Sequence, residues 1–234
     1  MNTPTKITVT RIIAVVLMLI SLFVLSVIPN FKTIEIANTG INLVYLIVFV
    51  IFVVACYTDH LDGYLARKNN QVTDLGKFLD PVADKLLINS LVIFLIAPSI
   101  FSPYIPETCG PVVGFNMWCA IVLVARDIIV DALRFIGAAK GKVIAANIFG
   151  KFKTVLEMVA ISLVLLNGFP FNYFDASWPV GLHITDFIVY VTTLMSLISG
   201  IIYVVQNRKV FLEKENDNQW FKRYICSKKS NLFI

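Results

Sequence analysis

Six long apolar stretches run through this sequence, and several reach the roughly 20 residues that a helix needs to cross the hydrocarbon core of a bilayer. Backbone polar groups in lipid must be satisfied within the spanning segment, so such stretches are expected to be helical. Only 15% of the 234 residues are charged, where a soluble domain has roughly 25%, and the mean hydropathy is +0.80. The sequence therefore predicts an all-α integral membrane protein with a short N-terminal interfacial segment, residues 1–11. Six transmembrane helices are predicted at residues 12–28, 41–67, 78–96, 112–135, 149–166 and 180–205.

The basic residues are distributed unequally over the segments that connect the spans. The loops after the first, third and fifth spans contain Lys32 and no other Lys or Arg. Because basic residues collect on the cytoplasmic side of a membrane, both termini are predicted to be cytoplasmic. The chain then divides into a membrane domain, residues 1–206, and a basic cytoplasmic tail, residues 207–234. The basic residues are too dispersed to indicate a nucleic-acid partner, and no two of the four cysteines have ligand-like spacing.

Four carboxylates lie between the second and third apolar stretches, where charges at membrane depth normally mark a functional site. Asp59 and Asp62 are three residues apart, and Asp80 and Asp84 are four apart, so each pair lies on one face of a helix. The polar turn between the pairs, which contains Gly76, brings the two helices side by side. Four anions gathered there require cations, and oxygen ligands favour hard divalent ions such as Mg²⁺ or Mn²⁺. Two such ions bridged by carboxylates form an arrangement that holds a phosphoryl group during transfer.

Small and basic residues follow the first carboxylate pair. Gly63 and Ala66 leave room for a ligand near the helix backbone, and Arg67 carries a planar guanidinium that matches phosphate oxygens. Helix-end charges in a solvated loop account well for Lys68 and Asp74, but poorly for the four aspartates together. The stretch is therefore interpreted as a metal and phosphate site.

Eight residues of this stretch, with their spacing, resemble the signature of the CDP-alcohol phosphatidyltransferase family. The pattern is Asp59-x2-Asp62-Gly63-x2-Ala66-Arg67-x8-Gly76-x3-Asp80-x3-Asp84. Shorter motifs resemble the phosphatidylglycerophosphate synthases within that family. These motifs are Asn2-x-Pro4 with Thr8 and Arg11, Ala125-Arg126-Asp127 with Leu133-Arg134, and Gly150-Lys151-Phe152-Lys153-Thr154. The resemblance extends over all six predicted spans.

The resemblance implies a membrane enzyme that transfers the phosphatidyl group of CDP-diacylglycerol to glycerol 3-phosphate, giving phosphatidylglycerophosphate and CMP. It implies that the four aspartates surround two divalent ions, Mg²⁺ or Mn²⁺, and that Asp84 also takes the proton of the attacking glycerol hydroxyl. Gly63, Arg67 and Thr73 match positions that bind the CDP moiety. Members of the family are homodimers, and the implied location is a bacterial cell membrane with the active site facing the cytoplasm.

Basic residues near the cytoplasmic ends of the fourth and fifth spans are candidates for binding the phosphate of the acceptor. Arg126 and Lys151 are favoured, and Arg134 and Lys153 come second. Each of these residues could instead be an anchor that follows the positive-inside rule. However, Arg126 precedes residue 135, the predicted end of its span, by about 13 Å at helical rise, which is too deep for an anchor.

Acidic residues accompany these cations. Asp127 is expected to pair with Arg126, and Asp131 and Glu157 are candidates to pair with Arg134 or Lys153. Acids at the last two positions are unusual for the synthases, so they bear on which alcohol is the acceptor.

The nearest alternative keeps the chemistry and changes the acceptor, as in cardiolipin synthases and phosphatidylserine synthases. A cation transporter is a different class that also uses intramembrane acids. Its acids are expected to spread through the depth of the bilayer and its helices to break at paired positions, whereas the four aspartates lie at one level. The intact signature disfavours a catalytically inactive relative.

Overall fold

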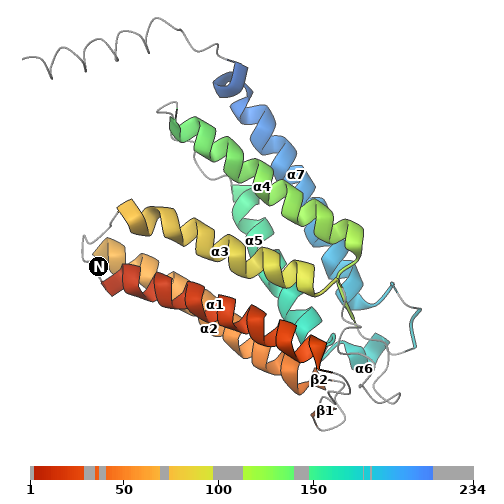
Figure 1. Ribbon diagram of the computed structural model, residues 1–234. Coiled ribbons are helices and arrows are strands. Elements are labelled where there is room, and N and C mark those ends of the chain that lie inside the picture. Colours follow the sequence, from red (N-terminus) through yellow and green to blue (C-terminus); the bar gives the residue numbers. More distant parts are fainter. Residues whose placement is uncertain are drawn as a thin grey trace, which may run out of the picture.

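The computed structural model is a bundle of long α-helices (Figure 1). It describes residues 3–28, 35–36, 41–68, 74–96, 113–139, 148–175, 177–179 and 181–212. The long helices of the described chain are α1 (Thr3–Val27), α2 (Leu43–Lys68), α3 (Asp74–Phe94), α4 (Met117–Ala139), α5 (Ile148–Leu165) and α7 (Ile184–Leu212). The minor elements are a one-turn helix, α6 (Asn172–Asp175), and two antiparallel two-residue strands, β1 (Glu35–Ile36) and β2 (Ile41–Asn42). Apart from this strand pair, the prediction of an all-α fold is confirmed.

The interfacial segment predicted at residues 1–11 is not a separate element. Helix α1 runs without a break from Thr3 to Val27. Pro4 stands in the first turn, where its missing N–H removes no intrahelical hydrogen bond, and no glycine or further proline interrupts the helix. Arg11 therefore lies inside α1 and not in a flanking segment.

The last helix is longer than the sixth predicted span. Helix α7 continues beyond residue 205 as far as Leu212, so residues 207–212 of the predicted tail are helical. This segment contains neither glycine nor proline, so nothing in its sequence forces the helix to stop. Residues 213–234 of the tail lie outside the described residues.

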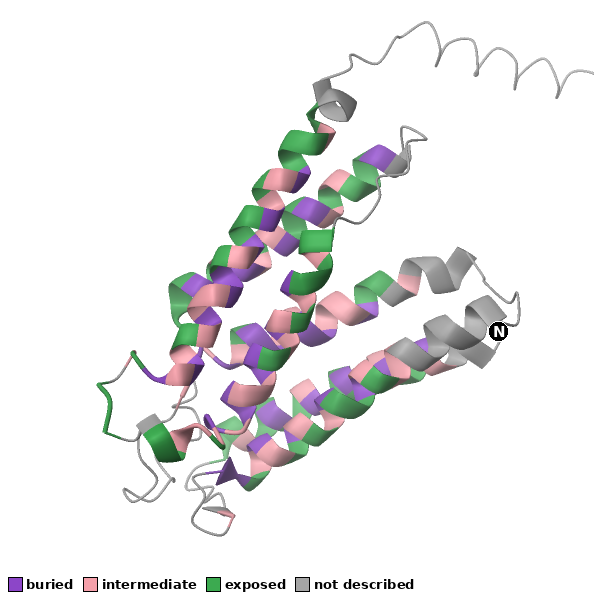
Figure 2. Cartoon of the chain, turned by 180° about the vertical axis from the view of Figure 1, so that it is seen from behind, coloured by how far each residue is buried: buried purple, intermediate pink, exposed green. Residues whose placement is uncertain are grey.

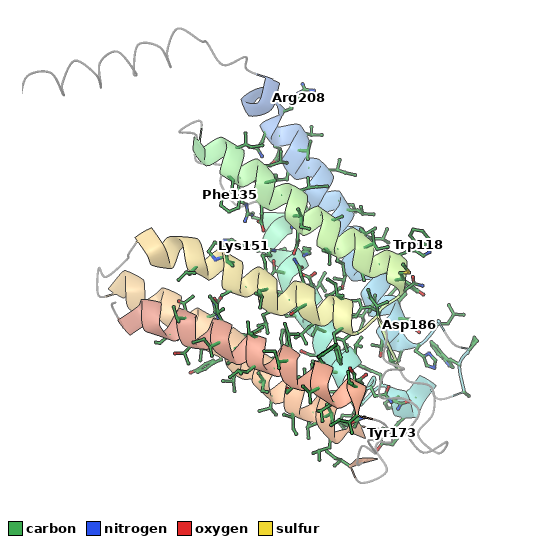
Figure 3. All side chains as sticks on the ribbon, viewed as in Figure 1. Trp118, Phe135, Lys151, Tyr173, Asp186 and Arg208 are labelled. Carbon is green, nitrogen blue, oxygen red and sulfur yellow. The ribbon has the colours of Figure 1, made fainter. Side chains whose placement is uncertain are left out.

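The helices pack as two connected groups of three. Helix α1 packs along α2 and α3, and α7 packs along α4 and α5; contacts of α2 with α5, and of α3 with α4 and α5, join the groups. Buried side chains from all six helices form the core, among them Val15, Phe52, Leu91, Leu123 and Ile161. The N-terminal ends of α1, α3 and α5 lie at the same end of the bundle as the C-terminal ends of α2, α4 and α7 (Figure 1). Figure 3 shows this arrangement through labelled residues, with Phe135 and Arg208 toward that end and Trp118 and Asp186 toward the other.

The outward faces of the helices are apolar. On α1 the large exposed residues recur at helical spacing, at Ile13, Leu17, Ile20, Val24 and Val27. Helix α7 shows the same pattern at Phe187, Leu194, Ile198, Ile201 and Val205, and green, exposed positions line the outer sides of the bundle (Figure 2). Soluble monomers rarely expose so much contiguous apolar surface, whereas lipid covers it in a membrane.

Two described helices contain a stretch long and apolar enough to cross a membrane, Ile7–Val27 and Ile184–Arg208, and a shorter apolar stretch covers Leu43–Asp59. Helices α3, α4 and α5 carry more charged residues than these two stretches. The fold is thus consistent with a membrane protein whose polar groups gather on the inner helices.

Candidate functional site

Asp59 and Asp84 are the members of the acidic motif whose side chains the structure describes. Asp59 lies on α2 and Asp84 on α3, and these helices contact each other and run in opposite directions (Figure 1). The remaining residues predicted for the metal and CDP sites lie outside the described side chains: Asp62, Gly63, Arg67, Thr73 and Asp80. The roles of these five residues therefore stay predictions.

Arg11 is the partner of Asp59. Its Nη1 donates to Oδ1 of Asp59, and the Arg11 side chain is almost fully buried. A second and a third nitrogen of Arg11, Nε and Nη2, are buried without a hydrogen-bond partner in the part of the chain that the structure describes. An ionised side chain at such a depth is expected to face a partner inside the bundle, as Arg11 does. The sequence predicts Arg11 outside the first span, in residues 1–11, whereas it lies about one-third of the way along α1. The signal in the sequence is that no glycine or proline separates Arg11 from the apolar run.

The Asp84 carboxylate lies within electrostatic reach of Asp59, Arg11, Lys85 and Asp127. No hydrogen bond to it is found among the described residues, so its lone pairs are open to a metal ion or to a proton. Carboxylate oxygens are the donors that Mg²⁺ and Mn²⁺ prefer, so Asp59 and Asp84 suit such ions. Within the described side chains there is no group of three or more metal-type ligands, and the other two aspartates of the motif lie outside them.

A second charged group, the basic cluster, centres on Asp127 of α4. We define it as Lys85, Arg126, Asp127, Lys153 and Glu157. Oδ1 of Asp127 accepts hydrogen bonds from Nζ of Lys153 at 2.7 Å and from Nη1 of Arg126 at 3.0 Å. Oδ2 of Asp127 accepts one from Nζ of Lys85 at 2.7 Å. One carboxylate thereby holds cations from α3, α4 and α5.

Two of the predicted acceptor ligands, Arg126 and Lys153, belong to the basic cluster. Lys153 is fully buried and also donates to Oε2 of Glu157 at 2.6 Å. The expected pairing of Arg126 with Asp127 is confirmed, as is a pairing of Glu157 with Lys153. Buried charges are stable only when they are paired in this way.

Two glycines and a serine fit around Arg126. Its Nη2 donates to Oγ of Ser199 on α7 at 2.6 Å. A Cβ atom added at Gly200 would stand 3.0 Å from Cγ of Arg126, and one added at Gly150 would stand 3.8 Å from its Nη2. Gly200 therefore permits the close approach of α4 and α7 at this level, where an apolar groove of about 410 Å³ runs between the two helices.

The other two predicted acceptor ligands are more exposed. Lys151 lies in the first turn of α5 with its side chain exposed (Figure 3). Arg134 lies two turns beyond Arg126 on α4 and forms the expected pair with Asp131, with Nη1 and Oδ1 3.8 Å apart. The guanidinium carbon of Arg134 also lies 5.6 Å from the centre of the Tyr203 ring.

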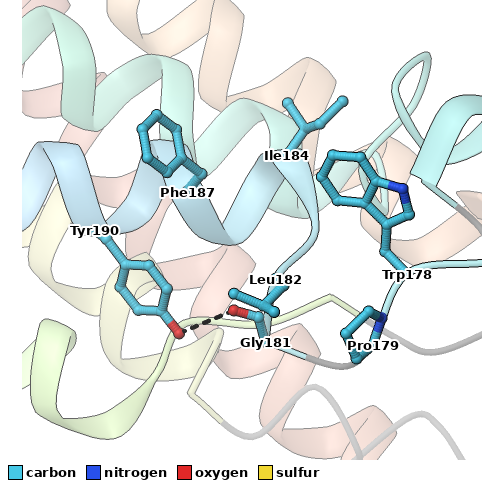
Figure 4. Close-up of a pocket in the computed structure, with 7 residues that line it drawn as sticks. All are labelled: Trp178, Pro179, Gly181, Leu182, Ile184, Phe187 and Tyr190. Atoms are coloured by element: carbon cyan, nitrogen blue, oxygen red, sulfur yellow. Dashed lines mark hydrogen bonds between the residues drawn. The ribbon is translucent and has the colours of Figure 1, made fainter.

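A separate cavity of about 640 Å³ lies where α7 begins, toward the other end of the bundle (Figure 4). Apolar residues such as Trp178, Leu182 and Phe187 line it, and Tyr190 Oη donates to the carbonyl of Gly181 at 3.4 Å. Among the described residues that line this cavity none is charged.

Comparison with known proteins gives one consistent result. The family model described as CDP-alcohol phosphatidyltransferase matches residues 1–205. The CDP-diacylglycerol–glycerol-3-phosphate 3-phosphatidyltransferase of Bacillus subtilis (strain 168) is 34% identical over 212 residues, which cover 88% of this chain and 95% of the relative. The protein of Rickettsia bellii (strain RML369-C) with the same name is 29% identical over 90% of this chain and 97% of its own. CDP-diacylglycerol–glycerol-3-phosphate 3-phosphatidyltransferase 2 of Arabidopsis thaliana is 33% identical over 70% of this chain and 68% of its own.

Proposed function

The chain belongs to the CDP-alcohol phosphatidyltransferase family, and we propose that it transfers the phosphatidyl group of CDP-diacylglycerol to glycerol 3-phosphate. The products are phosphatidylglycerophosphate and CMP. One observation in the structure supports the proposal most directly. Asp84 belongs to the acidic motif, and the next residue of α3, Lys85, belongs to the basic cluster. The two proposed sites, one for the reacting phosphates and one for a phosphorylated acceptor, would thus share helix α3.

In the proposed mechanism Asp84 is the general base. It takes the proton of the attacking glycerol hydroxyl while the new P–O bond forms on the phosphatidyl phosphorus and the bond between the two phosphates breaks. Its carboxylate suits this role because the described residues leave its oxygens unengaged. Two divalent ions, Mg²⁺ or Mn²⁺, held by Asp59, Asp62, Asp80 and Asp84 would offset the charge of the pyrophosphate.

Substrate phosphates are bound on both sides of this base. Gly63, Arg67 and Thr73 are proposed to bind the CDP moiety, by resemblance to the family. The proposed ligands of the glycerol 3-phosphate phosphate are Arg126, Lys151, Arg134 and Lys153. The support from the structure is strongest for Arg126, because it is partly buried at the edge of the cluster and its Nε has no hydrogen-bond partner among the described residues.

We infer six membrane-spanning helices, α1 to α5 and α7, with both termini and the active site on the cytoplasmic side of a bacterial cell membrane. The support is the distribution of basic residues, since Lys32 is the only Lys or Arg in the loops assigned to the outer side. A homodimer is proposed from the family resemblance alone.

The proposed reaction is tested with purified protein in mixed micelles that contain CDP-diacylglycerol. Labelled glycerol 3-phosphate, serine and phosphatidylglycerol are offered in separate reactions, each with Mg²⁺, with Mn²⁺ and with a chelator. We expect a new labelled lipid product from glycerol 3-phosphate only, release of one CMP per lipid formed, and no turnover with the chelator. Incorporation of serine or phosphatidylglycerol in place of glycerol 3-phosphate would refute the assigned acceptor.

A further inference from the structure

Within the basic cluster the cations exceed the acids by one charge. Its cations are Lys85, Arg126 and Lys153, and its acids are Asp127 and Glu157. Asp84 and Asp131 also act on Lys85 from outside the cluster, but Asp84 is assigned to the metal ions and Asp131 pairs with Arg134. These groups lie well inside the bundle, where an unpaired charge is costly. An anion is therefore the kind of ligand that would complete the cluster.

The three cations differ in the hydrogen-bond donors that they have left. Lys153 is bonded to two acids, and its side chain is only 1% exposed. Arg126 is bonded to Asp127 and Ser199 and is 11% exposed. Lys85 has Asp127 as its one bonded partner among the described residues, and its side chain is 24% exposed. Because an ammonium group has three donors, Lys85 has two left for a ligand, whereas Lys153 has one and is not accessible.

The position of Lys85 indicates which substrate phosphate it meets. Its bond to Asp127 directs it toward α4, the helix that carries Arg126, whereas the residues proposed to bind CDP, Gly63 and Arg67, lie on α2. Lys85 also follows Asp84 directly and is within its electrostatic reach. If the phosphate of glycerol 3-phosphate is held between Lys85 and Arg126, the attacking hydroxyl group of its glycerol lies near Asp84.

We propose that Lys85 is a further ligand of the acceptor phosphate and that Asp127 is the positioning residue that holds Lys85 beside Arg126. The proposal rests on the proposed function and adds a specific contact to it. Asp127 accepts from both cations through different oxygens, so it fixes their separation while leaving donors of each available. Lys85 then binds the acceptor phosphate. Lys153, which is paired with Glu157, also donates to Asp127 and so keeps the Asp127 carboxylate in place.

Steady-state kinetics of Lys85→Gln test the proposal, with KM measured separately for glycerol 3-phosphate and for CDP-diacylglycerol. Loss of one charge-assisted hydrogen bond should raise the KM for glycerol 3-phosphate about ten- to a hundredfold, while the KM for CDP-diacylglycerol changes less than about twofold. Lys85→Arg should recover part of the loss. The matched control is Arg208→Gln, which removes an exposed cation near the end of α7 and should leave both constants unchanged.

A second measurement uses the wild-type protein and does not depend on how the variants fold. Acetylation of Lys85 by an amine-reactive reagent is quantified by peptide mass spectrometry. Glycerol 3-phosphate should protect Lys85, and CDP-diacylglycerol alone should not. An unchanged KM for glycerol 3-phosphate in folded Lys85→Gln, a rise confined to the KM for CDP-diacylglycerol, or absence of protection would each overturn the proposal. If instead the wild-type protein does not use glycerol 3-phosphate at all, the proposed function itself is wrong.

Discussion

Replacing Asp127 by Asn should destabilise the bundle more than any other single amide substitution on α4. The side chain keeps its shape, but the carboxylate that accepts from Lys85, Arg126 and Lys153 is lost. Asn offers one acceptor oxygen, and its NH₂ group must then face one of the cations. The excess positive charge of the basic cluster doubles from one to two.

The magnitude follows from the burial of these groups. Removing one partner of a buried ion pair costs about 3–5 kcal/mol, because the remaining charge stays buried without compensation. Three cations depend on Asp127, but Lys153 keeps Glu157 and Lys85 is partly exposed, so the costs do not add. For a protein of this size, about 3–5 kcal/mol corresponds to a fall of about 6–20 °C in Tm.

The assay is thermal denaturation of detergent-solubilised protein, followed by fluorescence-detected size-exclusion chromatography at one heating rate. Asp131→Asn is the matched control, because it makes the same change one turn along α4. The ion pair of Asp131 with the exposed Arg134, 3.8 Å long in the described part of the chain, is worth at most about 1 kcal/mol. If Asp127→Asn lowered Tm no more than Asp131→Asn, Asp127 would not be the charge centre that we describe.

Three further predictions concern the two sites. Asp84→Asn should abolish phosphatidyl transfer and leave Tm nearly unchanged, and retained turnover would contradict its role as the base. Gly200→Val should lower Tm by about 2–12 °C, from about 1–3 kcal/mol of overpacking against Arg126, whereas Gly150→Ala should be tolerated because the added atom meets Arg126 at ordinary contact distance. Arg11→Gln should lower the Mg²⁺ concentration that gives half-maximal turnover, because a cation that competes for the metal-binding carboxylate is removed; an increase would show that Arg11 supports metal binding.

The sequence predicted the ion pairs formed within one helix and could not predict the ion pairs formed between helices. Lys153 with Glu157 and Arg134 with Asp131 lie three or four residues apart, so the pitch of one helix is enough to bring them together. Arg11 with Asp59 and Lys85 with Asp127 join different helices, more than 40 residues apart in sequence. Such pairs depend on how one helix is rotated and shifted relative to another. The apolar pattern does not determine this arrangement, because several registers bury the same apolar faces equally well.

The apolar pattern predicted where the long helices lie better than where two of them end. Apolar runs located the long helices, because the bilayer core and the helical rise fix how many apolar residues a span needs. They did not locate the ends of α1 and α7, which continue into polar sequence at Thr3 and Leu212. Hydropathy indicates which residues can lie in lipid. A helix, in contrast, ends where its backbone hydrogen bonds can no longer be formed. Between Pro4 and residue 12 of α1, and between residues 205 and 212 of α7, no glycine or proline favours such an end.

In each of the two groups of helices, one helix supplies a polar side chain to a charged residue of another helix. The two helices that contain the long apolar stretches, α1 and α7, each pack along a pair of helices, and each buries more than one polar side chain. Arg11 of α1 reaches Asp59, and Ser199 of α7 reaches Arg126. Their outward residues only have to be apolar, since lipid has no shape to match, so exchanges such as Leu17→Ile or Leu194→Val should matter little. Arg11 and Ser199 are each tied to a partner on another helix, so α1 and α7 are free to vary on the outward side and constrained on the inward side.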